Sequence, residues 1–283
     1  MPELPEVETV RRGIEAAVAG ARLLEVDLRR PDLRWPIPAD LPDRSRGARL
    51  THLGRRSKYV LFHLDNGETL ILHLGMSGRV TIDAEGAARL YHQAATDPRH
   101  DHVEWRFDNG TRIVLNDPRR FGALDIARTD ALADHPLLAR IGPEPLGNAF
   151  DAGHLHARLA RSRTPIKVAL LDQRNVAGLG NIYVNEALHR AGISPRRRAG
   201  NVSARRLEPL VRHIRDVLTE AIEAGGSSLR DHRQTDGSLG YFQHNFRVYD
   251  QEGRACPTEG CDGVIRRIVQ GGRSTYHCPR CQR

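Results

Sequence analysis

The sequence predicts an α+β protein of several domains, with a leading helix, a β-sandwich, a helical region and a zinc-binding β-hairpin. Three observations predict this architecture. Short apolar and β-branched runs separated by turns fill residues 21–115, the hydrophobic period becomes helical after about residue 150, and all four cysteines lie among the last 28 residues. A length of 283 residues is enough for about two domains, each with its own core.

A helix followed by short strands is expected in the first 130 residues. Apolar residues repeat at helical spacing at Val7, Val10, Ile14 and Val18. The predicted strands are 21–29, 48–53, 58–64, 69–74, 103–107 and 111–115. The pairs Asn66-Gly67 and Asn109-Gly110 each lie between two such runs, and Asn-Gly favours the tight turn of a hairpin. These residues therefore predict a β-sandwich or a flattened barrel.

The helical region follows a segment rich in proline. Residues 130–150 contain Pro136, Pro143 and Pro145 and are interpreted as a linker, and helices are expected at 151–161 and 165–173. A long amphipathic helix begins after Ser203 and ends at Gly225-Gly226, and the Gly- and Ser-rich segment 225–240 is expected to be a mobile loop or a plain tether. The predicted divisions are 1–130, 131–150, 151–240 and 241–283.

The four cysteines have the spacing of a structural zinc site. Cys256 and Cys261 form a Cys-x4-Cys pair, and Cys278 and Cys281 form a Cys-x2-Cys pair sixteen residues later. Four thiolates leave no open position for water, so one Zn²⁺ would support folding rather than chemistry. The alternative is a pair of disulfides, which a cytosolic protein disfavours. Strands at 264–269 and 274–277, joined at Gly271-Gly272, would point Arg273 outward, where it could bind phosphate.

Composition favours nucleic acid as the partner. The net charge is +8, the pI is about 9.8, and basic residues are scattered along the whole chain. A basic surface without a specific partner is the alternative. All but two of the 43 basic residues are Arg, so Lys58 and Lys167 are candidates for positions that need a compact, titratable ammonium. The chain has no run of about 18 apolar residues and its first residues are acidic, which predicts a soluble cytosolic protein.

The first residues could supply a nucleophile. Removal of Met1 leaves Pro2 as a secondary amine, and an α-amino group has a pKa of roughly 7.7 to 8.0, so a useful fraction of it is unprotonated near neutral pH, unlike an ordinary lysine. Attack of such an amine on a sugar carbon gives an iminium, which acts as an electron sink, and Glu3 could shuttle protons beside it. The alternative is that Pro2 and Pro5 merely stiffen the approach to the helix.

Several motifs resemble the bacterial formamidopyrimidine-DNA glycosylases along the whole chain. They are PELPEVETV at residue 2, RRSKYV around Lys58, HLGMSGR around Met76, NDPRRFG at 116–122, GLGNIYVNE at 178–186 and the terminal CPRCQR. The resemblance implies an N-terminal β-sandwich, a helix-two-turns-helix domain and a zinc-finger hairpin, with DNA held in the cleft between domains. The chain departs from the family in its first cysteine pair, which is often Cys-x2-Cys, and this puts only the detail of that knuckle in doubt.

The resemblance also implies roles for particular residues. Met76, Arg119 and Phe121 match the residues that fill the gap left by an extracted nucleotide. Lys167, Asn181 and Arg273 match the phosphate clamp. Lys58 matches a lysine near the catalytic terminus, and Glu6 is expected to organise that terminus through backbone hydrogen bonds. Taken singly, Met76 and Phe121 could be core residues and Asn181 a plain helix N-cap.

The implied function is a glycosylase and AP lyase of base excision repair. Pro2 would attack C1′ of an oxidised purine nucleotide such as 8-oxoguanine or a formamidopyrimidine, and β- and δ-elimination would then cut the strand. Damaged duplex DNA is the expected partner of a monomer in the cytoplasm, at the nucleoid, without a small-molecule cofactor. Two alternatives stay open, an endonuclease VIII-like enzyme for oxidised pyrimidines and a non-catalytic zinc-bearing DNA-binding protein. Against the first stand Leu4, where such enzymes usually have Gly, and the intact set Met76, Arg119 and Phe121. Against the second stand Pro2, Glu3 and Lys58, because binding alone needs none of them.

Overall fold

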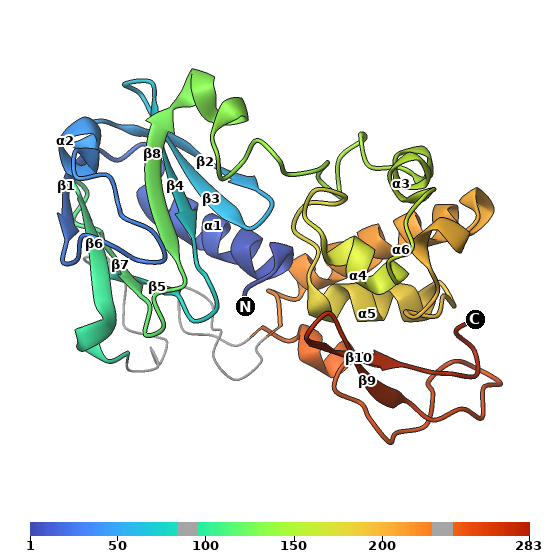
Figure 1. Ribbon diagram of the computed structural model, residues 1–283. Coiled ribbons are helices and arrows are strands. Elements are labelled where there is room, and N and C mark those ends of the chain that lie inside the picture. Colours follow the sequence, from blue (N-terminus) through green and yellow to red (C-terminus); the bar gives the residue numbers. More distant parts are fainter. Residues whose placement is uncertain (84–95, 228–239) are drawn as a thin grey trace. The chain divides into compact units, whose positions relative to one another are not determined.

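The computed structural model describes residues 1–83, 96–227 and 240–283, which fall into two compact units (Figure 1). The first unit is Met1–Ala139 with Ala224–Tyr241, and the second is Arg140–Glu223 with Phe242–Arg283. Each unit is described here by itself. The four-part division of the chain stays a prediction.

The first unit is the β-sandwich that the sequence predicts. One antiparallel sheet has the spatial order β1 (Leu23–Leu28), β6 (Asp101–Phe107), β7 (Arg112–Asn116) and β5 (Arg79–Asp83). The other has the order β2 (Leu50–Arg56), β3 (Tyr59–Leu64), β4 (Glu68–His73) and β8 (Ala123–Arg128). Side chains from both sheets share one hydrophobic core, in which Phe62 of β3 stacks on Trp105 of β6 at a ring-centroid distance of 6.0 Å.

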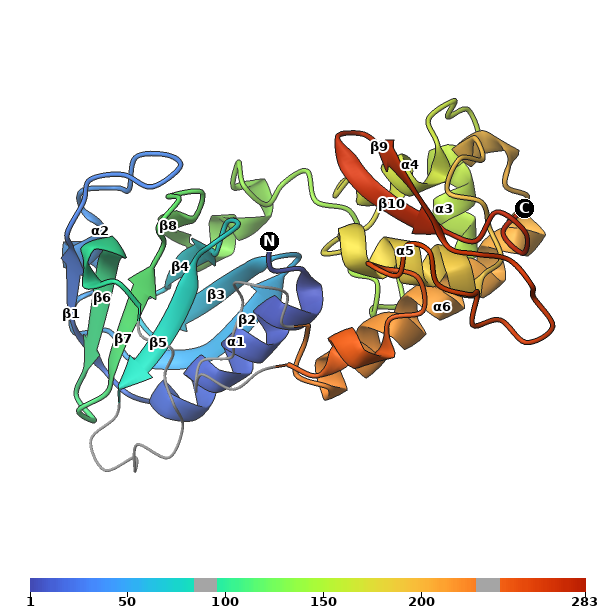
Figure 2. The same ribbon diagram turned by 90° about the horizontal axis from the view of Figure 1, so that it is seen from below.

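Helix α1 (Leu4–Val18) completes this core. It packs against β2 and β3 of one sheet and β5 of the other (Figure 2). Its buried stripe contains the apolar positions that predicted the helix, Val7, Val10, Ile14 and Val18. The five-residue helix α2 (Leu41–Ser45) was not expected, because it is too short to show a period; the Ser45 hydroxyl donates to the Leu41 carbonyl at 2.7 Å.

Strands β5 and β8 are absent from the sequence-based prediction. Strand β5 is only five residues long although its polar and apolar residues alternate, and β8 does not alternate regularly; each pairs with a distant segment, β5 with β7 and β8 with β4. Both Asn-Gly hairpins are present, joining β3 to β4 and β6 to β7.

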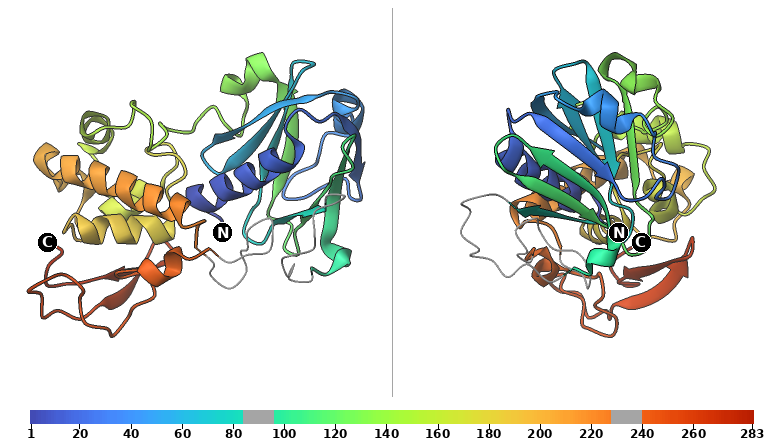
Figure 3. Two further views of the ribbon diagram at one scale, coloured as in Figure 1. Left: turned by 180° about the vertical axis from the view of Figure 1, so that it is seen from behind. Right: turned by 90° about the vertical axis from the view of Figure 1, so that its left-hand side faces the viewer.

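The second unit is built on four helices. They are α3 (Ala152–Leu159), α4 (Ile166–Leu171), α5 (Asn181–Arg190) and α6 (Ala204–Glu223). Figure 3 shows α5 beside α6, and almost all of α5 is buried, which places it at the centre of this unit. Short 3-10 turns in the two units are η1 (Pro98–His100), η2 (Thr129–Asp134), η3 (Ala199–Asn201) and η4 (Phe242–Asn245). None of the helices in the described ranges is long and apolar enough to cross a membrane.

The last forty residues form a small β-hairpin packed on α5. Its strands are β9 (Arg266–Gln270) and β10 (Arg273–His277), and its own core is small. Two side chains of α5 hold it: the Asn185 Oδ1 atom accepts from the Tyr276 backbone N–H at 2.9 Å, and the buried Glu186 carboxylate accepts three backbone N–H groups from residues 247–249. The hairpin is thus anchored to the helices through buried hydrogen bonds.

Candidate functional site

The predicted catalytic terminus lies at the start of α1. Glu3 is the residue before the helix, and its backbone N–H donates to the Glu6 Oε2 atom at 2.9 Å in a capping box. The other oxygen of Glu6 accepts from the Ser227 N–H at 2.8 Å and the Ser227 hydroxyl at 2.9 Å. Both glutamates are buried, as is Pro2. One carboxylate therefore fixes the residue after Pro2 and the end of the segment that leads out of α6.

The segment after Ser227 belongs to the loop expected at Gly225–Gly240. Residues 228–239 lie outside the described residues, so the predicted mobility of that loop stays a prediction. Helix α6 ends at Glu223, two residues before Gly225.

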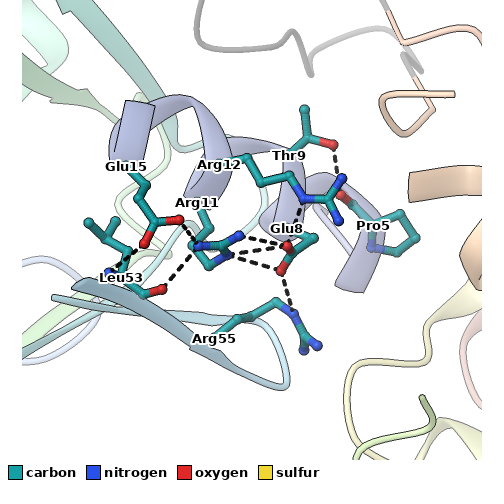
Figure 4. Close-up of polar contacts among 8 residues, drawn as sticks. All are labelled: Pro5, Glu8, Thr9, Arg11, Arg12, Glu15, Leu53 and Arg55. Carbon is teal, nitrogen blue, oxygen red and sulfur yellow. Dashed lines mark hydrogen bonds and ion pairs between the residues drawn. The ribbon is translucent and has the colours of Figure 1, made fainter. Parts of the chain in front are cut away.

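Lys58 lies in the turn between β2 and β3, and its side chain is 5% exposed. One ion pair ties the end of β2, beside this turn, to α1 (Figure 4): the Glu8 carboxylate, which also pairs with Arg11 of its own helix, contacts the Arg55 Nε atom at 3.2 Å. Arg55 in turn donates to the Ser57 carbonyl at 2.8 Å. Burial raises the pKa of Glu8, but its arginine partners lower it by more, so the pKa lies below its ordinary value and Glu8 stays ionised. The Lys58 turn is thereby joined to the helix that begins beside Pro2.

His73, the last residue of β4, accepts the Gly75 backbone N–H at its Nδ1 atom at 2.9 Å. Burial lowers the pKa of His73 to about 4, and the nearby charges of Lys58 and Arg34 lower it in the same direction. The imidazole is therefore neutral at physiological pH, as an acceptor must be. Its ring holds Gly75, the residue before Met76 in the loop that follows β4.

The three predicted gap-filling residues lie on two loops that touch. Met76 follows β4, and Arg119 and Phe121 lie between β7 and β8. The side chains of Met76 and Phe121 are 41% and 42% exposed, and Arg119 is exposed too. The Arg119 guanidinium lies over the Phe121 ring at 4.9 Å. The structure brings these residues together and leaves them outside the core.

Lys167 and Asn181 converge on the hairpin in the second unit. The Lys167 Nζ atom donates to the Thr275 hydroxyl at 2.8 Å and to the Ser274 carbonyl at 3.2 Å, and the Asn181 Nδ2 atom donates to the same carbonyl at 3.0 Å. Lys167 is fully buried. Asn181 is the first residue of α5 and Gly180 is the N-cap, so the plain N-cap interpretation of Asn181 is wrong. Arg273, exposed at the start of β10, is the residue before Ser274.

The four cysteine sulfurs lie within 4.8 Å of one another. Cys256 Sγ is 3.7 Å from Cys281 Sγ, and Cys261 Sγ is 3.7 Å from Cys278 Sγ. A tetrahedral Zn²⁺ with Zn–S bonds of about 2.3 Å spaces its sulfurs about 3.8 Å apart, and both of these Sγ pairs are close to that spacing, so the cluster suits one ion. The chain holds one structural zinc through these residues, and the disulfide alternative is wrong because all four thiols are unbridged.

Several residues around these sites escaped the sequence analysis. The His189 Nε2 atom lies 3.5 Å from Cys256 Sγ, Glu186 anchors the segment before the hairpin, and Asp117 and Ser77 link the two loops that carry the exposed residues. Glu186 and Asp117 stand inside quoted motifs, so their position in a motif was a usable signal. Ser77 also lies inside a quoted motif, HLGMSGR, whereas nothing local marks His189.

Comparison with known families covers most of the chain. Residues 1–124 match the formamidopyrimidine-DNA glycosylase N-terminal domain, residues 141–233 match the formamidopyrimidine-DNA glycosylase H2TH domain, and residues 255–283 match a zinc finger found in FPG and IleRS. The chain is 61% identical to formamidopyrimidine-DNA glycosylase of Dinoroseobacter shibae, with full coverage of both chains.

Solved structures agree in fold. A complex of a Lactococcus lactis FPG mutant with DNA containing Fapy-dG has a TM-score of 0.87 and 34% identity over the full length of both chains. A MutM complex with DNA containing carbocyclic 8-oxo-G has a TM-score of 0.86 and 34% identity, again over both full lengths. Matching domains in order, full-length identity and a shared fold lead to one conclusion: this chain belongs to the formamidopyrimidine-DNA glycosylase family.

Proposed function

We propose that Pro2, freed by removal of Met1, is the nucleophile with which this chain removes oxidised purines from duplex DNA and then cuts the strand. The proposal is carried by the capping box between Glu3 and Glu6. It fixes the conformation of Glu3, the residue after Pro2, and both carboxylates are buried. The names of two solved relatives add support, because those proteins are bound to DNA containing Fapy-dG and 8-oxo-G.

Each step assigns a role to a residue of this chain. As the Pro2 lone pair attacks C1′, Glu3 protonates O4′ and the sugar ring opens. The glycosidic bond then breaks, and the base leaves with the proton that the Pro2 nitrogen gives up, which leaves the iminium between Pro2 and C1′. Because the iminium withdraws electrons, a proton is lost from C2′ and the 3′ C–O bond breaks. A second elimination breaks the 5′ C–O bond, and water finally releases the sugar fragment from Pro2.

The other residues would bind and position the DNA. Lys58 supplies positive charge near the terminus, where it can hold a phosphate or assist departure of the base. Met76, Arg119 and Phe121 fill the gap left by the extracted nucleotide, and their exposure on adjoining loops supports that role. Lys167, Asn181 and Arg273 form the phosphate clamp. Zinc bound by the four cysteines supplies folding energy to the hairpin that carries Arg273.

Covalent trapping tests the proposal. Borohydride should reduce the iminium and lock the chain onto duplex DNA containing 8-oxoguanine, with the adduct mapping to Pro2. A chain that retains Met1 has an amide nitrogen at Pro2 and should bind DNA without trapping or cutting. Glu3→Gln should bind DNA but lose base release, because it cannot carry the proton.

The same assay separates the alternatives. Faster trapping on oxidised pyrimidines than on 8-oxoguanine would favour an endonuclease VIII-like preference. A processed chain that binds DNA but traps on no lesion would refute the enzymatic proposal.

A further inference from the structure

The two loops that carry Met76, Arg119 and Phe121 meet backbone to backbone. These are residues 74–78, after β4, and residues 117–122, after β7, called here the wedge loops. A Cβ atom on Gly75 would lie 2.3 Å from the Phe121 carbonyl carbon and 2.4 Å from the Gly122 nitrogen, and Gly75 has a φ of +64°. On Gly122 it would lie 2.9 Å from the His73 carbonyl oxygen. Only glycine allows this approach, so the loops are in direct contact.

A single buried carboxylate joins the wedge loops. Asp117 is fully buried, and its Oδ1 atom accepts from the Ser77 hydroxyl at 2.7 Å while its Oδ2 atom accepts from the Gly122 backbone N–H at 2.8 Å. The Ser77 oxygen in turn accepts from the Arg119 backbone N–H at 3.2 Å. These hydrogen bonds therefore link Ser77 in the first loop to Arg119 and, through Asp117, to Gly122 in the second loop.

The Asp117 backbone is itself held by the neighbouring strand. Its N–H donates to the His100 carbonyl at 2.9 Å, and its carbonyl lies 3.0 Å from the His102 Nε2 atom. His102 lies in β6 and is buried. The carboxylate thus projects from a fixed point of the sheet toward two loops that are otherwise exposed at their tips. A rigid base of this kind can set where those tips point.

We propose that Asp117, acting with Ser77, is a positioning residue that holds Met76, Arg119 and Phe121 in one rigid arrangement for insertion into DNA. This rests on the gap-filling role given to those residues under the proposed function. Side chains ordered before binding lose less conformational entropy when they replace a base in the stack. Loss of the Asp117–Ser77 hydrogen bonds should slow base release, which requires extraction of a nucleotide from a paired duplex. It should slow reaction at an abasic site less, because no base has to be unpaired there.

The test compares two substrates in single-turnover reactions, 8-oxoguanine opposite cytosine and an abasic site in the same duplex. Asp117→Ala and Ser77→Ala should slow 8-oxoguanine release about tenfold, the effect of losing one or two charge-assisted hydrogen bonds, and slow abasic-site cleavage much less. Asp117→Asn should restore the rate, because its Oδ1 atom can accept from Gly122 while its Nδ2 atom donates to the Ser77 oxygen. Asp130→Ala, at an exposed carboxylate paired with Arg128, is the matched control and should change neither rate.

Hydrogen exchange reports on the bond between Asp117 and the Gly122 amide independently of activity. The Gly122 amide should exchange faster in Asp117→Ala than in the wild type, and Ser77→Ala serves the same purpose if Asp117→Ala does not fold. Equal slowing on both substrates, or a full 8-oxoguanine rate in Asp117→Ala, would overturn the positioning role. A wild-type chain inactive on both substrates would instead overturn the proposed function. The exchange measurement would still establish whether Asp117 holds the wedge loops together.

Discussion

Arg119 and Phe121 form a stacked pair on one exposed loop, with the guanidinium over the ring. A stacked guanidinium keeps its N–H donors pointing along its own plane, where they can meet the edge of a base. Phe121 contributes an apolar face suited to parting a base step. In the pair, Phe121 is therefore suited to separating stacked bases and Arg119 to recognising the base opposite the lesion.

Arg119→Ala should narrow the preference for cytosine over adenine opposite 8-oxoguanine. A good bidentate contact to a base edge provides about 1–3 kcal/mol of discrimination, so the ratio of the two excision rates should fall roughly tenfold. Single-turnover rates on the two duplexes measure it, with Arg99→Ala, at a residue 85% exposed, as the control. A lower rate with an unchanged ratio would make Arg119 a residue that only positions the DNA.

Lys167 lies in a different environment, buried against the hairpin. Lys167→Met keeps most of the packed volume and removes the charge. If the ammonium contributes to phosphate binding, affinity for all DNA should fall alike and the slope of log affinity against log salt should decrease by about one unit. Binding titrations across salt concentrations measure this. A lower melting temperature with an unchanged slope would show that Lys167 only anchors Ser274 and Thr275.

At the scale of single residues, the sequence identifies side chains that stand out by type. Met76 is the only methionine besides Met1, Lys58 and Lys167 are the only lysines, and the cysteines have metal spacing. Asp117 does not stand out by type, and although it lies inside a quoted motif, the motif does not reveal its bond to Ser77, forty positions away in sequence. The role of a residue that acts through a long-range hydrogen bond becomes clear only once the fold brings the two segments together.

Glu104 links three parts of the sheet β1-β6-β7-β5. Its carboxylate contacts Arg112 of β7 and Arg106 of β6 at 2.9 Å each, and Arg29, just after β1, at 2.5 Å. Hydrogen bonds from Arg112 and, more weakly, Arg106 together lower the pKa of Glu104 to about 2, although burial acts in the opposite direction. The sheet is therefore stabilised by the Glu104 carboxylate only while that carboxylate is ionised.

The pKa of Glu104 predicts a pH-dependent cost of Glu104→Gln. The folded pKa, about 2, lies below the ordinary value of 4.5, so the stabilisation is complete above pH 4.5 and is lost as the pH falls toward 2. Because the arginine partners are half exposed, the cost at pH 7 should be about 1–2 kcal/mol of unfolding free energy. Denaturant titrations at pH 7 and pH 3 would show it. The control Glu25→Gln should cost less than about 0.5 kcal/mol, and an equal cost at both pH values would contradict the assignment.

At the scale of elements, the sequence predicts those whose pattern is local. Helix α1 shows its own period, and the hairpins β3–β4 and β6–β7 have Asn-Gly turns. Strand β8 was missed because it pairs with β4 across some fifty intervening residues, and only that partner makes it a strand.

The whole molecule has two units whose stabilities should separate when zinc is lost. Cys278→Ser should release the metal and unfold the chain from about residue 245, because the small hairpin core cannot fold without it. The β-sandwich, with its own continuous core, should stay folded. Metal analysis, thermal unfolding and DNA titration on this variant measure the three effects, with chelated and zinc-restored wild type as the control. Unchanged DNA affinity in the metal-free protein would contradict the prediction.

The bonds from Ser227 to Glu6 connect two residues of the first unit that are 221 positions apart. The intervening chain includes the whole four-helix region, so a ribosome makes those helices before it makes the partner of Glu6. The nascent sandwich can collapse early, but the carboxylate beside Pro2 cannot acquire its serine partner until translation is nearly complete. Maturation of the catalytic terminus would then be a late event in the life of each newly made chain, after most of both cores have been synthesised.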